Sequence, residues 1–216
     1  MCKRALDVVG AAVGLLLIGP VWVAAAALIK LHDGGPVLYA GRRVGRFGVP
    51  FSMLKFRTMV VDADRIGGPS TSLDDPRVTP LGRWLRRYKL DELPQLLNVL
   101  RGDMSLVGPR PEVQQYVDLY TKDERAILSV RPGITDWASL WNSDEGAWLA
   151  GSPDPERTYL EEIRPEKLRL QLAYVRQQSL VTDLEILVRT AAAMVFRKHV
   201  AATRARVTEG GGATSR

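Results

Sequence analysis

The sequence predicts an α+β protein that is mainly helical, with an N-terminal re-entrant membrane hairpin helix and a small cytosolic domain containing a short antiparallel β-hairpin. Three observations lead to this fold class. Residues Val8 to Ile29 form a run of 22 uncharged residues, segments 36–44 and 49–59 alternate in polarity around a glycine-containing turn, and the chain after residue 80 carries apolar residues at helical spacing. A length of 216 residues favours one compact domain plus an attachment.

Composition excludes several classes of protein. The chain has 25% charged and 7% aromatic residues, which is globular rather than disordered composition. One cysteine, Cys2, excludes an internal disulfide framework and a multi-cysteine metal site, and His32 and His199 are too far apart in sequence for a convincing metal motif. The net charge is +6, and its whole surplus lies between Arg42 and Arg110. Such a block would attract nucleic acid, anionic lipid headgroups or phosphorylated metabolites.

The apolar run has three possible interpretations: a cleaved signal peptide, a spanning helix, and a helix that enters the bilayer and returns. As a helix of 22 residues it would be about 33 Å long, enough to cross the hydrocarbon core. Signal peptides have shorter apolar regions of roughly 7–15 residues, which counts against the first interpretation.

The middle and the flanks of the run favour a re-entrant membrane helix that comprises residues 1–31. Gly19 and Pro20 lie near the centre, where proline removes one helical hydrogen bond and predicts a sharp bend. Basic residues on both sides draw both ends toward the cytoplasm. These flanking residues are Lys3, Arg4, Lys30, Arg42, Arg43 and Arg46. A spanning helix that is only kinked by its proline stays open as the alternative.

After the hairpin, the sequence predicts a loop and then short helices. Residues 62–80 are rich in Gly, Pro, Ser and Asp, which is typical of a loop. Residues 81–90 form a short basic helix, and a second helix is expected from Asp91 to Gly102.

The C-terminal half predicts one helix, a further stretch of amphipathic helices and a tail. One helix is expected from Glu112 to Val130, and helical patterning resumes from Glu156 and extends to Lys198. The latter is amphipathic, so it either packs on the domain or lies in the membrane interface. Residues 32–198 are therefore assigned to the domain, and residues 199–216 to a disordered tail.

Two adjacent carboxylates, Asp91 and Glu92, lie among arginines and just before a Gly/Pro/Arg loop at 108–111. Neighbouring helical positions point about 100° apart, so the two carboxylates are expected to have different roles. Carboxylates beside cations fit phosphoryl chemistry. The alternative is that Asp91 only caps a helix and Glu92 only favours the helix dipole. The sequence lacks the phosphate-binding loop of nucleotide triphosphatases and the G-x-S-x-G motif of acyl transfer.

Several segments in fixed order resemble the bacterial sugar transferase family, the small monotopic phosphoglycosyl transferases that act on polyprenol phosphate. The resemblance extends to about residue 195 and includes a weaker match, TDLEIL at 182–187. The main segments are KRALD at 3–7, the proline-broken run, GGPVLYAGRRVGRFGVPF from 34, KFRTM from 55, DPRVTPLGRWLR from 75, LDELPQLLNVLRGDMSLVGPRPE from 90, and RPGIT from 131. Segment 132–145, PGITDWASLWNSDE, departs from the common family pattern.

The resemblance implies that Asp91 attacks the β-phosphate of a nucleoside diphosphate sugar, which releases the nucleoside monophosphate and leaves a covalent sugar-phosphoryl aspartate. Polyprenol phosphate then receives the sugar phosphate from Asp91. Glu92 would assist by positioning the acceptor or by deprotonating it, and Mg2+ would bind near Asp91. Arg110, inside the GPRP loop, is the strongest phosphate-binding candidate. The full set of substrate-binding candidates is Lys55, Arg57, Arg77, Arg83, Arg86 and Arg110.

The implied function is to initiate glycan or exopolysaccharide assembly at the cytoplasmic face of the bacterial inner membrane. Its partners would be the nucleotide sugar, polyprenol (undecaprenyl) phosphate and membrane lipids, with no nucleic acid; homo-oligomerisation is left open. The alternative is a membrane-tethered regulatory or nucleic-acid-binding module without catalysis, which would use the arginines as a backbone-binding patch.

Overall fold

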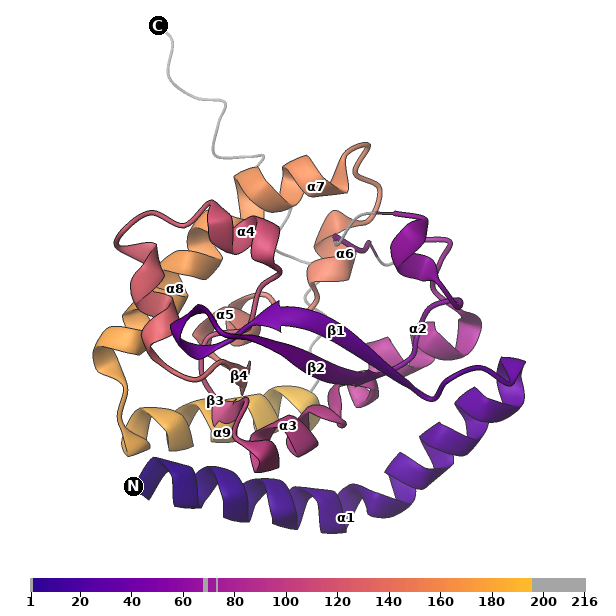
Figure 1. Ribbon diagram of the computed structural model, residues 1–216, viewed down its shortest axis with the longest axis horizontal. Coiled ribbons are helices and arrows are strands. Elements are labelled where there is room, and N and C mark those ends of the chain that lie inside the picture. Colours follow the sequence, from indigo (N-terminus) through magenta and orange to yellow (C-terminus); the bar gives the residue numbers. More distant parts are fainter. Residues whose placement is uncertain (1, 68–69, 73, 196–216) are drawn as a thin grey trace, which may run out of the picture.

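The computed structural model describes residues 2–67, 70–72 and 74–195. The described chain is mostly helical with two small sheets, which confirms the predicted α+β class (Figure 1). The proposed tail, 199–216, and the last three residues of the proposed domain lie outside the described residues. The longer helices are α1 (Cys2–Asp33), α2 (Pro80–Arg87), α3 (Gln95–Arg101), α8 (Arg164–Gln177) and α9 (Leu180–Val195). The short ones are α4 (Gln114–Asp118), α5 (Trp137–Trp141), α6 (Glu145–Leu149) and α7 (Pro155–Thr158).

The predicted β-hairpin is confirmed. Strands β1 (Leu38–Val44) and β2 (Pro50–Phe56) pair antiparallel, with Ala40 opposite Leu54. The turn between them needs left-handed backbone at Phe47 (φ 58°) and Gly48 (φ 78°), which the glycine adopts without a steric penalty. The hairpin carries Lys55 toward the centre of the domain.

The structure has a second sheet that was not predicted from the sequence. Strands β3 (Ser105–Val107) and β4 (Gly133–Thr135) pair in parallel, with Ser105 opposite Gly133. Each strand has only three residues, too few for polarity alternation to be recognised.

Close backbone packing at this sheet gives a stability prediction. A Cβ added to Gly133 would lie 2.1 Å from the backbone nitrogen of Gly108, and neither backbone segment can rotate away. Gly133→Ala should therefore destabilise the protein by about 3 kcal/mol, the upper end of overpacking costs. Thermal or denaturant unfolding in detergent checks this. Gly19→Ala is the matched control, since a Cβ there meets nothing within 4 Å; equal stability of the two variants would contradict the prediction.

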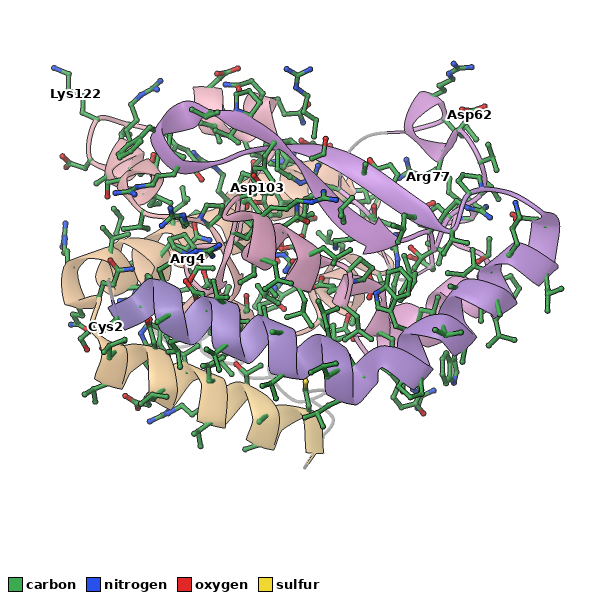
Figure 2. The ribbon with its side chains drawn as sticks, turned by 60° about the horizontal axis from the view of Figure 1, so that its bottom comes forward. Cys2, Arg4, Asp62, Arg77, Asp103 and Lys122 are labelled. Carbon is green, nitrogen blue, oxygen red and sulfur yellow. The ribbon has the colours of Figure 1, made fainter. Side chains whose placement is uncertain are left out.

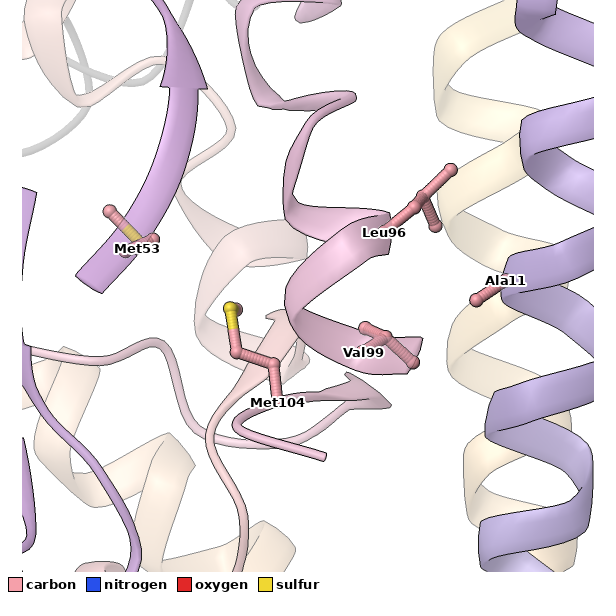
Figure 3. Close-up of a cluster of buried hydrophobic side chains, with 5 residues drawn as sticks. All are labelled: Ala11, Met53, Leu96, Val99 and Met104. Carbon is pink, nitrogen blue, oxygen red and sulfur yellow. The ribbon is translucent and has the colours of Figure 1, made fainter. Parts of the chain in front are cut away.

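Helix α1 is continuous through Pro20, and its axis bends near the middle of the helix (Figure 1). The predicted bend is therefore present as a curve in one helix, and the two limbs do not fold back against each other. Among the described residues, α1 is the one helix that is long and apolar enough to cross a membrane. Only 11% of its apolar 18-residue window is buried inside the domain. Ala11 of α1 packs on Leu96 and Val99 of α3, while Met53 and Met104 lie on the far side of α3 (Figure 3).

Polar contacts fasten the N-terminal end of α1 to the domain. Lys3 donates to the carboxylate of Asp183 in α9 (2.7 Å), and Arg4 donates to the carbonyl of Val99 at the end of α3 (2.6 Å). The carboxylate of Asp7 in α1 is buried against the domain, where it accepts hydrogen bonds from the Ser105 hydroxyl (2.8 Å) and from the backbone N–H of residue 106. Figure 2 shows Arg4 pointing from α1 toward the domain. The sequence predicts a role for Lys3 and Arg4 in membrane orientation, and it does not reveal these contacts with the domain.

The prediction of one helix from Glu112 to Val130 is wrong. The structure has α4 and then a separate 3₁₀ segment, η4 (Glu124–Ser129). Thr121 and Glu124 cap one another: the Thr121 N–H donates to the Glu124 carboxylate (2.7 Å), and the Glu124 N–H donates to the Thr121 hydroxyl (3.3 Å). This reciprocal capping begins a new turn and ends the continuous helix.

The helical patterning expected from Glu156 to Lys198 is confirmed up to Val195, where the described residues end, and it is divided among several helices. The segment consists of α7, a π-helical turn at Tyr159–Ile163, α8 and α9. Between α8 and α9 the hydroxyl of Ser179 accepts a hydrogen bond from the N–H of Thr182 (3.1 Å), the pattern of an N-cap. The break lets α9 turn back and lie beside the first half of α1 (Figures 1 and 2).

Candidate functional site

Residues from three parts of the chain meet in one buried charged cluster. Asp91 and Glu92 lie in the 3₁₀ turn η3 (Leu90–Glu92), Lys55 projects from β2, and Arg110 follows β3. Lys89 adopts left-handed backbone (φ 57°), which ends α2 and redirects the chain into η3. The predicted helix over 91–102 therefore begins later, at Gln95, and Pro94 rather than Asp91 occupies its N-cap position. The interpretation of Asp91 as a mere helix cap is wrong.

The Asp91 carboxylate is buried and incompletely paired. Its side chain is 7% exposed, Oδ2 lies 3.9 Å from Lys55 Nζ, and Oδ1 is buried without a hydrogen-bond partner. Burial raises the pKa of Asp91 above its ordinary value, against the opposing charge of Lys55. A buried acceptor oxygen without a hydrogen-bond partner lowers the stability of the fold, so we expect it to bind a ligand.

Glu92 is fully engaged by cations. Lys55 Nζ donates to Glu92 Oε1 (3.1 Å), and the Arg110 guanidinium grips both carboxylate oxygens, with 3.0 Å from Nη1 to Oε2. Burial opposes the charge on Glu92, but Arg110 and then Lys55 outweigh it, so the pKa of Glu92 lies well below its ordinary value. The same pairing with Glu92 raises the pKa of Arg110. Glu92 therefore holds two cations, Lys55 and Arg110.

Asp136 holds the loop that carries Arg110, a contact that the sequence analysis missed. Its buried carboxylate accepts from the Arg110 backbone N–H (3.3 Å) and from the Gln171 amide (3.2 Å). It also caps α5 through the N–H of Ser139 (2.7 Å). The sequence signal was available, because aspartate directly before a run that begins with Trp137 and Ala138 is a preferred helix N-cap.

The other predicted phosphate-binding arginines occupy different surroundings. Arg57 binds the carboxylate of Asp33 at the end of α1, and Arg77 binds Asp75 (2.7 Å). Arg83 is exposed and donates to a backbone carbonyl of the preceding loop. Arg86 donates to a threonine hydroxyl (2.9 Å); its burial lowers its pKa, while the negative charge of Asp91 acts in the opposite direction. Lys55 and Arg110 are thus the candidates in direct contact with the carboxylate pair, and Arg86 borders it.

The residues fit a magnesium ion only in part. The free Oδ1 of Asp91 is a hard oxygen ligand of the kind that Mg2+ prefers, whereas both Glu92 oxygens are bound by cations. Within the described residues, no cluster of three or more Asp, Glu, His or Cys side chains could hold a metal ion. A Mg2+ ion would therefore take one protein ligand, Asp91, and the rest from water and a phosphorylated substrate, a common arrangement for this cation.

Comparison with known proteins gives a consistent family. A family model described as bacterial sugar transferase matches residues 1–197. The exopolysaccharide production protein ExoY of Rhizobium meliloti is 44% identical over 135 residues, which cover 56% of this chain and 60% of that protein. A UDP-glucose:undecaprenyl-phosphate glucose-1-phosphate transferase of Caulobacter vibrioides is 50% identical over 119 residues, which cover 55% of this chain and 45% of that protein.

A third relative aligns over more of the chain. The galactosyl transferase CpsE of Streptococcus agalactiae is 37% identical over 201 residues, which cover 88% of this chain and 41% of that protein. This chain therefore spans less than two thirds of the length of each of these three relatives.

Proposed function

This chain belongs to the bacterial sugar transferase family, and we propose on that basis that it transfers a sugar 1-phosphate from a nucleoside diphosphate sugar to undecaprenyl phosphate in exopolysaccharide synthesis. The names of its relatives supply both substrate classes, since one acts on UDP-glucose and undecaprenyl phosphate. The observation that carries the proposal is the buried Asp91 carboxylate with one unpartnered oxygen, beside Glu92, Lys55 and Arg110.

The proposed reaction has two steps. An oxygen of Asp91 attacks the β-phosphorus of the donor; the new bond joins that oxygen to phosphorus, and the bond to the bridging oxygen breaks, so the nucleoside monophosphate leaves with the electron pair. A phosphate oxygen of undecaprenyl phosphate then attacks the same phosphorus and releases the Asp91 carboxylate. Lys55 and Arg110 are placed to offset the negative charge that the donor brings beside Asp91.

Release of a nucleoside monophosphate tests the function directly. The protein in detergent is incubated with a panel of nucleotide sugars, with and without undecaprenyl phosphate, and monophosphate is quantified. One donor should give release in excess over enzyme only when the acceptor is present. Salt-dependent binding to bare DNA without monophosphate release from any donor would favour the regulatory or nucleic-acid-binding alternative.

Divalent metal should be required for full turnover. Mg2+ bound through Asp91 and the substrate would offset the charge of the diphosphate, a contribution worth several kcal/mol. Excess chelator is therefore expected to lower turnover by about 100-fold or more, with recovery on adding Mg2+. Undiminished turnover in chelator would remove the metal from the proposal.

The contacts of α1 support a re-entrant helix with both ends on the domain side. Lys3, Arg4 and Asp7 bind the domain at the start of α1, and Asp33 pairs with Arg57 of the domain at its end. A helix that crossed the bilayer could not keep both sets of contacts. The basic flanks support the cytoplasm as that common side, where the nucleotide sugar would be available.

Cys2 offers a direct test of this topology, because it is exposed and is the sole cysteine of the sequence. A membrane-impermeant maleimide should leave Cys2 unlabelled in intact spheroplasts and label it after permeabilisation. The comparison site is the exposed Lys122, on the domain surface (Figure 2). The variant Lys122→Cys in a Cys2→Ser background should behave in the same way. Labelling of Cys2 alone in intact spheroplasts would show that α1 spans the membrane.

A further inference from the structure

A cavity of about 440 Å³, open to the surface, lies between α5, α8 and α9. Ligand sites typically have volumes of about 300–1,000 Å³, so this cavity can hold a substantial group. Its walls are Trp137, Leu140 and Trp141 of α5, Leu170 of α8, and Arg189 and Ala192 of α9. Since five of these six side chains are apolar or aromatic, the cavity suits an uncharged hydrocarbon better than a sugar or a nucleotide.

The one charged wall residue, Arg189, has a side chain that is 62% exposed and lies in a surface ion pair. The Arg189 guanidinium pairs with Glu185 (2.7 Å) and lies 5.5 Å from the centre of the Trp137 ring. The positive charge of Arg189 thus lies beside a carboxylate and an aromatic ring, and the aliphatic part of its side chain can add apolar surface to the cavity. This arrangement favours an apolar chain over a second phosphate as the occupant.

The cavity flanks a helix with an apolar outer face. Val181, Leu184 and Val188 of α9 are exposed at helical spacing on successive turns. Helix α9 also lies beside the first half of α1, whose leucines Leu16 and Leu17 are more than 70% exposed (Figure 1). An apolar face of this kind is expected to contact the membrane surface. A chain that leaves the bilayer beside α9 would reach the cavity over an apolar path.

One wall of the cavity is connected through hydrogen bonds to the buried charged cluster of Asp91, Glu92, Lys55 and Arg110. Trp137 directly follows Asp136, whose carboxylate accepts the backbone N–H of Arg110, and Arg110 grips Glu92. We propose that this cavity binds the isoprenoid chain of the acceptor, an inference that rests on the proposed function. The tail would then be held by α5 and α9 while the phosphate is free to approach Asp91.

Photocrosslinking tests the site without requiring turnover. Farnesyl phosphate with a diazirine on its distal isoprene unit is irradiated with the full-length protein in detergent, and labelled peptides are identified by mass spectrometry. Labels are expected on α5 and α9. Ala192→Trp fills the cavity from an exposed wall position and should reduce this labelling at least about tenfold. Ala191→Trp, at the adjacent exposed position outside the cavity wall, is the matched control and should label like the unaltered protein.

Two results would overturn the proposal. One is equal labelling of α5 and α9 in both tryptophan variants. The other is displacement of the label by phosphatidylglycerol as effectively as by unlabelled farnesyl phosphate, which would make the cavity a general lipid site. Formation of the aspartyl adduct from nucleotide sugar alone is measured separately in the unaltered protein. Its absence would count against the covalent mechanism and leave the crosslinking result unaffected.

Discussion

Asp91→Asn should abolish turnover and leave the protein folded, with stability equal to or greater than that of the unaltered protein. The amide cannot attack phosphorus as a carboxylate does, so we expect a loss of at least about 10⁴-fold, as for other removed nucleophiles. Turnover is followed as nucleoside monophosphate release in the presence of undecaprenyl phosphate. Asp62→Asn is the matched control, since it removes an exposed carboxylate from the surface and should leave turnover unchanged (Figure 2).

The expected stability follows from the burial of Asp91. A carboxyl group whose pKa is raised by folding makes the folded state less stable as the pH rises through that pKa. Near neutral pH the buried Asp91 carboxyl therefore lowers the free energy of unfolding, and replacing it with asparagine removes that cost. Thermal unfolding should show a higher Tm for the variant at pH 7, and the difference should shrink as the pH falls. A large drop in Tm at pH 7 would assign Asp91 a structural role.

The covalent step has its own measurement. Intact-protein mass spectrometry after a pulse of nucleotide sugar and Mg2+ should show a gain of one sugar phosphate in the unaltered protein and in Asp62→Asn, and none in Asp91→Asn. An adduct of equal yield on Asp91→Asn would place the attacking group elsewhere. An unaltered protein that turns over without ever showing the adduct would indicate direct transfer in a complex of both substrates.

Local features of the fold could be predicted from the sequence because their signals lie within a few residues. The β1–β2 hairpin follows from polarity alternation on both sides of a turn at Phe47 and Gly48. The short basic helix predicted from residue 81 is present as α2, which begins one residue earlier, at Pro80, where Thr79 accepts the N–H of Gly82 (2.9 Å).

Contacts between distant segments could not be predicted in the same way. Lys3 pairs with Asp183, and Asp136 holds Arg110, in each case across a long separation in sequence. Charges alone do not reveal such partners, since each of these residues could equally be solvated. The carboxylate pair itself was predicted correctly as a cluster among cations, but the sequence did not reveal that Glu92 is saturated while Asp91 retains an unpartnered oxygen. That asymmetry arises from the meeting of η3, β2 and the loop after β3.

Glu92→Gln should lower turnover by about 10²–10³-fold, the magnitude found when one preorganised electrostatic contact is removed from an active site. Glutamine keeps the shape of the side chain and removes the charge that holds Lys55 and Arg110. Because the pKa of Glu92 lies well below its ordinary value, the carboxylate is a poor base. The acceptor also needs little help, since the second pKa of a phosphate monoester is about 6. We therefore expect Glu92 to act as a positioning residue.

The two half-reactions separate positioning from proton removal. If Glu92 positions Lys55 and Arg110, Glu92→Gln should form the Asp91 adduct slowly, with the loss in rate already present before the acceptor is added. If Glu92 deprotonates the acceptor, the adduct should form at the unaltered rate and then accumulate when undecaprenyl phosphate is supplied. Glu161→Gln, which removes one side of an exposed surface pair with Arg157, is the control and should change neither rate. Rapid adduct formation followed by accumulation in Glu92→Gln would contradict the positioning role and assign Glu92 to the second step.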